Sequence, residues 1–256
     1  WNALMITGYC NAYKAFKDEY FLKRAEELSI FINEHMTSNG VLFHSYKNGQ
    51  AKINGFLEDY AFVIEGYLEL YEVSGKEIWL NKAKGLCEYT VQHFYDKTSG
   101  FFYFTSDEDE ELIIRKTEIS DNVIPASNSQ MARNMFKLHH YMHLPDLEEK
   151  AKKMCFKLQD EISHYVSGYS NWAMLACEFL YPFKEIAIVG KESRQKFENL
   201  NDKYLPNCLF AMSETASELP LLKDRFVEGK TSIYVCENNA CKLPVAAADE
   251  VLKLLQ

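Results

Sequence analysis

The stretch GFLEDYAF, residues 55–62, decides how this sequence is interpreted. It follows VLFHSYKNG at 41–49, which has the pattern of a short strand and turn, and it opens a long apolar helix. Gly55 permits a sharp turn before that helix. Glu58 and Asp59 then fall in the first helical turn, where the helix dipole favours negative charge. The two carboxylates are therefore either a site at the mouth of a buried helix or ordinary N-terminal charge.

Composition narrows the class of protein and of partner. The chain has 256 residues, of which 47% are hydrophobic, enough for one large or two modest domains with a sizeable core. Its net charge of −9 argues against nucleic acid or an anionic membrane as the main partner. No run of about eighteen apolar residues predicts a transmembrane helix. We therefore expect neither a nucleic-acid nor a membrane partner.

The cysteine pattern is typical of a reduced compartment. Five of the seven cysteines are scattered through apolar helical stretches, as buried thiols are. Cys236 and Cys241 are the one close pair, but their spacing is not that of a CxxC motif, and no further zinc ligands stand near them. We expect structural thiols in a cytoplasmic protein, with no metal and no cofactor; a redox or metal role is the alternative.

Apolar residues at helical spacing recur in pairs of segments. Asp18 is a plausible N-cap for the second of them. Similar openings, YFLKRAEEL at 20, WLNKAKGL at 79 and DLEEKAKKM at 146, each lead to a glycine and an aromatic-rich connector. Such hairpins cannot bury their apolar faces alone, so they must stack. The predicted helices span 1–16, 19–36, 57–73, 78–94, 129–142, 147–164 and 171–181, with extended pieces at 41–46 and 101–105.

The pattern changes after residue 183. Short β-branched and apolar runs alternate there with helical ones, which is typical of a small α/β unit. Gly190 stands alone, so the segment lacks a dinucleotide-binding fingerprint. We expect a helical domain at 1–183 and an α/β segment at 184–256. The predicted elements of the second part are strands at 185–190, 208–212 and 232–236 and helices at 192–205 and 246–255.

Polar and aromatic residues gather at the starts of every second helix. In hairpins that curve into a ring, these helices line the inside, and their equivalent ends point at one pocket. Carboxylates there suit acid or base chemistry, amides suit hydroxyl groups, and aromatic faces suit sugar rings. Capping is the alternative for each residue taken singly. The residues concerned are Trp1, Asn2, Glu58, Asp59, Tyr60, Ser127, Asn128, Asn171 and Trp172.

Several charged residues outside these helix starts are further candidates. His44 lies on a connector and can exchange a proton near neutral pH, although a packed, hydrogen-bonded histidine is the alternative. His139 and His143 share a helical face, but their place at a helix C-terminus explains them without a metal. Arg115 follows the acidic run 107–111, which we interpret as a solvated loop, and either pairs with that run or reaches the pocket.

Six motifs, in order along the chain, resemble one family. They are WNALMI at 1, HSYK at 44, GFLEDYAF at 55, the WL…A segment at 79, PASNS at 125 and YVCENNAC at 234. They are similar to the C-terminal part of the spermatogenesis-associated protein 20 family, whose bacterial members are YyaL-type proteins with a thioredoxin domain. Ala3 stands where the family usually has Gly. Pro125-Ala126-Ser127-Asn128-Ser129 stands where the family usually has a Pro-Ser-Gly-Asn-Ser-like motif.

The resemblance implies a fold and a set of relatives. It implies the latter half of an (α/α)6 toroid, similar to N-acylglucosamine 2-epimerases and six-hairpin glycosidases, plus a small α/β segment. The thioredoxin-like domain and the first hairpins would precede this chain, which opens on Trp1 in mid-pattern. The preceding hairpins of the same protein would then be a binding partner of this chain. Without them, the chain would expose apolar faces that favour its self-association. The family supplies no settled reaction, and a toroid does not fix a function.

Two functional hypotheses follow. In the first, the chain is a carbohydrate-active enzyme of the epimerase, isomerase or hydrolase type, with Asp59, Glu58 and His44 as acid and base and a small sugar as ligand. Hydrolysis would need a second carboxylate across the pocket, from Asp121 or from the preceding hairpins. In the second, the toroid is a non-catalytic binding or scaffold module, and any redox chemistry belongs to the thioredoxin-like domain.

Overall fold

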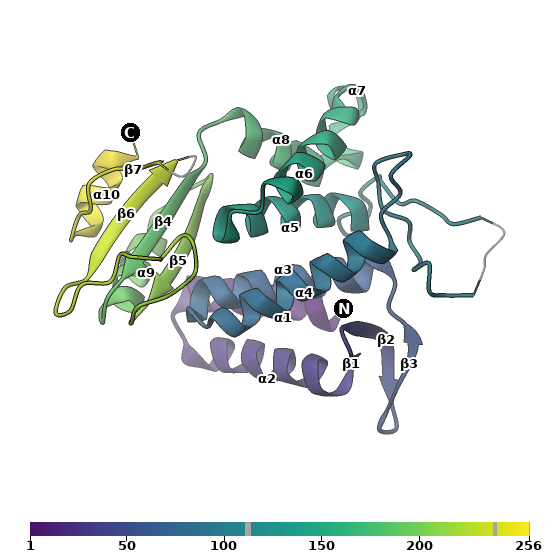
Figure 1. Cartoon of the computed structure of the whole chain (residues 1–256), viewed down its shortest axis with the longest axis horizontal. Helices are drawn as coiled ribbons and strands as arrows, with labels where there is room; N and C mark the ends of the chain where they lie inside the picture. Colours follow the sequence, from purple (N-terminus) through teal and green to yellow (C-terminus); the bar gives the residue numbers. More distant parts are fainter. Residues whose placement is uncertain (111–113, 238–239, 256) are drawn as a thin grey trace.

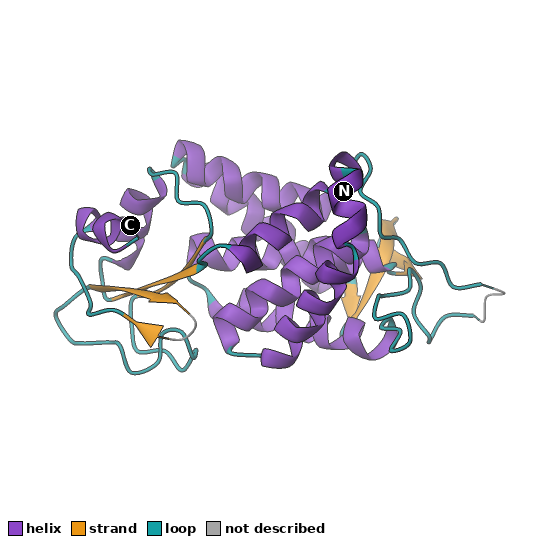
Figure 2. Ribbon diagram, turned by 90° about the horizontal axis from the view of Figure 1, so that it is seen from above, coloured by secondary structure: helices purple, strands orange, loops and turns teal. Residues whose placement is uncertain are grey.

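Residues 1–110, 114–237 and 240–255 are described in the computed structural model. Two rows of helices form the body of the molecule, and a small sheet lies at each end (Figures 1 and 2). Glu111 of the acidic run and the two asparagines of YVCENNAC lie outside the described residues. The paired helices are α1 (Asn2–Phe16), α2 (Glu19–His35), α3 (Leu57–Ser74), α4 (Glu77–His93), α5 (Ser127–Met142), α6 (Pro145–Lys157) and α8 (Ser170–Leu180).

Helix α3 is the centre of the core. It packs against α1, α5 and α4, and 13 of its 18 residues are buried. A helix with neighbours on several sides must be apolar around most of its circumference, which explains the long apolar run after GFLEDYAF. Gly66 permits the close approach of α1, because an added Cβ would lie 3.1 Å from Ile6 Cβ. Gly75 ends α3 in the left-handed conformation, at φ 68°.

The predicted helices are confirmed, with shifts at some boundaries. Asp18 caps α2 as expected, accepting a hydrogen bond from the backbone N–H of Tyr20. The helix expected at 147–164 begins earlier, with Pro145 in its first turn, where a missing N–H costs nothing. The same segment breaks at Leu158 into α6 and a short α7 (Gln159–His164), followed by the 3-10 turn η1 (Val166–Gly168).

A three-stranded antiparallel sheet covers one end of the helices. The extended piece at 41–46 is β2 (Val41–Lys47), between β1 (Thr37–Ser38) and β3 (Gln50–Asn54). Asn48 and Gly49 connect β2 to β3 with φ of 53° and 76°, as a primed hairpin turn requires. The expected strand at 101–105 is absent from the described elements; Phe102 makes only an isolated bridge to Tyr95.

The α/β unit after residue 183 is confirmed. Its sheet has the order β5-β4-β6-β7, with β4 and β5 parallel and the other pairs antiparallel. Helices α9 and α10 pack on this sheet, while its edge strand β5 meets α3 and α5 (Figure 1). The elements are β4 (Lys184–Val189), α9 (Ser193–Asn201), β5 (Cys208–Ser213), β6 (Ser232–Glu237), β7 (Ala240–Cys241) and α10 (Ala248–Leu254).

Side chains from the helices satisfy the edge of β5. Phe210 N–H donates to Glu72 Oε2 at 3.4 Å, and Tyr141 Oη donates to Phe210 O at 3.1 Å. An edge strand otherwise exposes unpaired backbone groups. Because one continuous apolar core runs from the helices into the sheet, the domain boundary at 183/184 stays a prediction.

One expectation about the cysteines is wrong. Cys236 and Cys241 are joined by a disulfide, because the register of β6 and β7 places them directly opposite each other. Cys10, Cys87 and Cys155 are buried thiols, as expected, and burial raises the pKa of each. Among the described helices, none combines the length and apolar character that crossing a lipid bilayer requires.

Candidate functional site

A cavity of about 180 Å³ opens at the N-terminal ends of α1 and α3. Strand β2 forms one wall, and the last turn of α2 closes the base. Most of its lining is apolar, with two carboxylates, one imidazole and one amide among it. The lining residues are Trp1, Asn2, Ala3, Leu4, Ile32, Met36, Leu42, Phe43, His44, Glu58, Asp59, Phe62, Val63 and Ile124.

His44 and Asp59 form a pair in this cavity. His44 Nδ1 lies 2.9 Å from Asp59 Oδ2 and 3.2 Å from Oδ1. A carboxylate accepts hydrogen bonds, so Nδ1 carries the hydrogen and Nε2 of the neutral ring is an acceptor. Within the described part of the chain, Nε2 has no hydrogen-bond partner. The pair therefore orients an imidazole that can take up a proton at Nε2.

Asp59 also caps its own helix. Its Oδ2 accepts the backbone N–H of Phe56 at 2.8 Å, as a third helical residue does in a capping box. The Phe56 ring packs on His44, with ring centroids 5.0 Å apart. The two interpretations of GFLEDYAF given by the sequence therefore both describe Asp59, which caps α3 and holds His44 in the cavity.

Glu58 has a different environment from Asp59. It is partly buried at the cavity wall and makes no hydrogen bond to the residues described. Burial raises the pKa of its carboxyl group, and the negative charges of Asp59 and Glu118 raise it further. A carboxyl group with a raised pKa that lines the same cavity as an imidazole with a free ring nitrogen is an arrangement suited to general acid–base chemistry.

The equivalent starts of α5 and α8 form no part of this cavity. Asp121 Oδ1 accepts from Ala126 N–H at 2.9 Å and from Ser129 Oγ at 2.8 Å, while Oδ2 accepts from Asn171 N–H at 2.8 Å. Asn171, in turn, donates to Ser129 Oγ at 3.0 Å and accepts from Arg133 at 3.0 Å. These side chains join the two helix starts to each other rather than facing a ligand.

Asn128 and Ser127 are buried, and their side chains hydrogen-bond to the segment that precedes α5. Asn128 Oδ1 accepts from Phe102 N–H at 2.7 Å, and its Nδ2 donates to the carbonyls of Phe102 and Glu118, both at 2.9 Å. Ser127 Oγ donates to a Glu118 carboxylate oxygen at 3.3 Å. The two side chains fasten Phe102 and Glu118 of the connector to the first turn of α5.

Three further candidates lie away from the cavity. Tyr60 is 1% exposed; its hydroxyl accepts the N–H of Leu42, and its ring stacks on Tyr89. Trp172 is fully buried and donates from Nε1 to Ile119 O at 2.8 Å. Arg115 does not reach the cavity either. Its guanidinium donates to the carbonyls of Thr105 and His93 and lies 4.2 Å from the centroid of the Tyr103 ring.

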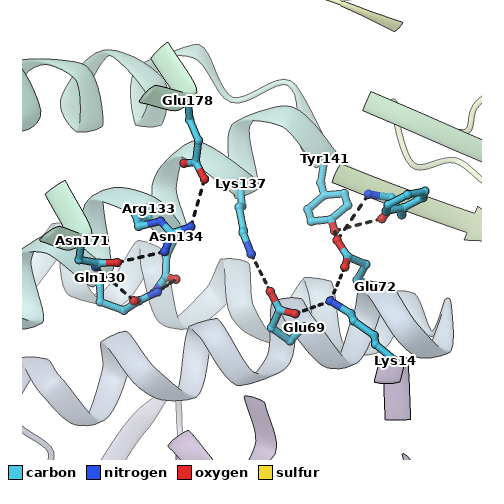
Figure 3. A network of polar contacts seen from close by, with 11 residues as sticks. Lys14, Glu69, Glu72, Gln130, Arg133, Asn134, Lys137, Tyr141, Asn171 and Glu178 are labelled. Carbon is cyan, nitrogen blue, oxygen red and sulfur yellow. Dashed lines mark hydrogen bonds and ion pairs between the residues drawn. The ribbon is translucent and has the colours of Figure 1, made fainter. Parts of the chain in front are cut away.

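A row of charged side chains along the inner helices was not predicted. Glu69 pairs with Lys14 of α1 at 2.7 Å and with Lys137 of α5 at 2.6 Å, which holds the pKa of its carboxyl well below the usual range (Figure 3). Glu65 makes no ion pair in the described chain, and burial raises its pKa to about 7. The signal was available in the sequence, since acids at 65, 69 and 72 share one face of an otherwise apolar helix.

No metal centre is present among the residues described, where no three His, Cys, Asp or Glu side chains group closely enough to hold an ion. His139 Nε2 instead faces Glu148 at 3.4 Å, and His143 ends α5 in the left-handed conformation.

Sequence comparison confirms the resemblance to spermatogenesis-associated protein 20. No family model matches the chain. It is 26% identical to human spermatogenesis-associated protein 20 over all of this chain and 35% of that protein. It is 28% identical to an uncharacterized protein of Caenorhabditis elegans over 99% of this chain and 37% of that protein. The chain thus spans about a third of the length of the curated relatives that it matches.

Structural comparison confirms the fold. The GH76 alpha-mannanase of Bacteroides thetaiotaomicron superposes with a TM-score of 0.51 at 16% identity, over 62% of this chain and 43% of the mannanase. A sugar epimerase from a ruminal bacterium superposes with a TM-score of 0.49 at 15% identity, over 62% of this chain and 42% of that one. The chain is a mainly helical, incomplete toroid of hairpins with a small α/β segment.

Proposed function

We propose that the cavity at the mouths of α1 and α3 is an acid–base site for a small sugar, of the epimerase or isomerase type. The observation that carries the proposal is the His44–Asp59 pair, 2.9 Å apart and facing the same cavity as the partly buried Glu58. The sugar class is supported by two structural neighbours whose names describe carbohydrate enzymes, a mannanase and a sugar epimerase.

Each polar group at the cavity has a role in this proposal. His44 Nε2 takes a proton from the sugar, and the Asp59 carboxylate stabilises the resulting imidazolium. Glu58, whose pKa is raised by burial, is the acid that returns a proton to the sugar. Trp1, 86% exposed at the rim, offers an aromatic face, and the Asn2 side chain offers an amide for hydroxyl groups.

Proton transfer fits the cavity better than hydrolysis of a glycosidic bond. Glycosidases use two carboxyl groups roughly 5–10 Å apart on opposite sides of the bond. The carboxylates that line this cavity in the described chain are the adjacent residues 58 and 59, on one wall. Asp121 was the candidate from the sequence for the second acid. Its carboxylate instead accepts hydrogen bonds from two backbone N–H groups and from the Ser129 hydroxyl.

A structural role for the pair is the second candidate. Because Asp59 Oδ2 accepts the N–H of Phe56, the His44–Asp59 contact also fastens β2 to the start of α3. In a binding or scaffold module that fastening would be its whole purpose. The two functions differ in whether loss of the imidazole changes chemistry or only stability.

Solvent-proton exchange into sugars separates these functions. The purified protein is incubated in D₂O with a panel of free aldoses and ketoses, and loss of each C–H signal is followed by proton NMR. We expect exchange at one position of at least one sugar, slowed by about 10²–10⁴-fold in His44→Gln. His93→Gln is the matched control, because His93 Nδ1 lies 2.8 Å from Asp107 Oδ1 outside the cavity.

The outcomes are distinct. Exchange that His93→Gln retains and His44→Gln loses supports the acid–base site. The catalytic proposal is contradicted by an absence of exchange with every sugar, or by equal rates in the two variants. If sugars then shift the fluorescence of Trp1 without any exchange, the cavity is a binding site only, since Trp79 and Trp172 are buried.

A further inference from the structure

The disulfide between β6 and β7 is in contact with a single arginine side chain. Arg225 Nη1 lies 3.1 Å from Cys236 Sγ, and Nη2 lies 3.1 Å from Cys241 Sγ. The guanidinium is itself held over the Tyr234 ring, 4.9 Å from its centroid. Cys236 is 1% exposed, whereas Cys241 is exposed. One sulfur is thus open to solvent, the other is buried, and a fixed positive charge touches both.

This arrangement favours thiol–disulfide exchange. Exchange is faster when the departing sulfur is a stable thiolate, and a neighbouring arginine stabilises a thiolate. Burial raises the pKa of the thiols of Cys10, Cys155 and Cys208, and no arginine of the described chain makes a hydrogen bond to any of the three sulfurs. The Arg225 contact therefore sets the bridged pair apart from these structural thiols.

A buried carboxylate stands beside the buried sulfur. Glu185 of β4 pairs directly with Cys236 across the β4–β6 ladder, so both side chains lie on the same face of the sheet. Glu185 is 1% exposed and binds His140 Nδ1 through Oε1 at 2.7 Å. Its Oε2, and Nε2 of His140, have no hydrogen-bond partner in the described chain.

The site is open to a small molecule. A cavity of about 360 Å³ reaches Cys236 and is lined also by Lys184, Val235, Glu237, Ala240 and Lys242. The lining carries two lysines against one glutamate: Lys184 is paired with Glu237, whereas Lys242 donates to the carbonyl of Leu254 and has no carboxylate partner in the described chain. The remaining positive charge suits a ligand that carries a carboxylate group.

We propose that Cys236–Cys241 is a thiol–disulfide exchange site for a small anionic thiol of the glutathione class. The thiolate of the small molecule attacks Cys241 Sγ, the S–S bond breaks, and Cys236 leaves as a thiolate beside Arg225. A second thiol attacks the sulfur of the small molecule in the mixed disulfide and releases Cys241 as a thiolate. Two thiols are oxidised to one disulfide, the protein pair is reduced to two thiols, and the two protons pass through solvent to the protein sulfurs.

Alkylation and mass spectrometry test the proposal. The folded protein is incubated with reduced glutathione, quenched, alkylated at free thiols, and digested for peptide mass analysis. We expect reduced glutathione to open the bridge. In Cys236→Ser, incubated instead with oxidised glutathione, we expect the free Cys241 thiol to exchange into a glutathione adduct and release one reduced glutathione. We expect Arg225→Gln to open about threefold to tenfold more slowly. Arg194→Gln is the control, because Arg194 also lies over a tyrosine, Tyr13, at 5.5 Å.

The proposal is overturned if glutathione leaves the bridge closed while circular dichroism shows a folded chain, or if Arg225→Gln opens at the wild-type rate. Should Arg225→Gln fail to fold, Arg225→Lys keeps the positive charge without the two-pronged contact, and its rate must then fall below that of the wild type.

Discussion

The start of α3 and the starts of α5 and α8 carry the same kinds of residue and use them differently. At α5 and α8, the polar atoms of Asp121, Asn128 and Asn171 are hydrogen-bonded to backbone groups and to neighbouring side chains. At α3, Glu58 has no hydrogen bond in the described chain, and His44 uses only one ring nitrogen. Unused hydrogen-bonding capacity, rather than residue type, is therefore what separates the candidate site at α3 from the other two helix starts.

The largest expected effect is on stability at α5. Asn128→Ala leaves the N–H and C=O of Phe102 and the C=O of Glu118 unpaired in a buried place, at a cost on the order of 3–5 kcal/mol. Glu58→Ala is expected to cost less than about 1 kcal/mol. Urea denaturation measures both, and similar losses in the two variants would remove the contrast between the helix starts.

A smaller effect, of opposite sign, is expected within α3. Burial raises the pKa of Glu65 to about 7 from 4.5. Below pH 4.5 both states are protonated and Glu65 contributes nothing. Between 4.5 and about 7 the unfolded chain releases the proton first, so the free energy of unfolding falls as pH rises, by on the order of 1–3 kcal/mol.

Glu65→Gln should therefore stabilise the protein at pH 8 and leave its stability at pH 4 unchanged. Thermal melts at the two pH values measure the gain. Glu69→Gln is the matched variant; it breaks contacts with Lys14 and Lys137 and should destabilise at pH 8. A gain from Glu65→Gln that is equal at both pH values would contradict this explanation.

The smallest effect compares the two histidine–aspartate pairs. His44→Gln and His93→Gln should each change the free energy of unfolding by about 0.5–1 kcal/mol, because pairs near the surface contribute little. Equal stabilities make any difference in sugar chemistry attributable to the cavity. A loss several times larger for His44→Gln would favour the view that its pair only fastens β2 to α3.

Local pattern predicted most of the fold. The helices follow from apolar spacing, and β2 from alternation, because each depends on neighbours in sequence. Strand β3 was missed because Gln50–Asn54 is mostly exposed and polar, so it shows no apolar alternation. The Cys236–Cys241 bridge was missed because it depends on the register of two strands.

The candidate site was predictable only in part. His44, Glu58 and Asp59 were found because they lie on a short strand and in the first turn of the next helix, where local geometry brings them together. The sequence could not show that Asp121 and Asn171, unlike these three residues, lie outside the cavity. Their partners are 50 residues apart along the chain, and only the packing of α5 against α8 shows that their polar atoms are already used.

The most direct test of the sugar site follows the imidazole signals of the seven histidines by NMR as each sugar is added. His44→Gln and His93→Gln assign the two signals that matter. The proposal predicts that a sugar which undergoes exchange shifts the His44 signal and leaves that of His93 in place. A His44 signal that no sugar moves, or one that moves only together with the His93 signal, would contradict a sugar site at the mouth of α3.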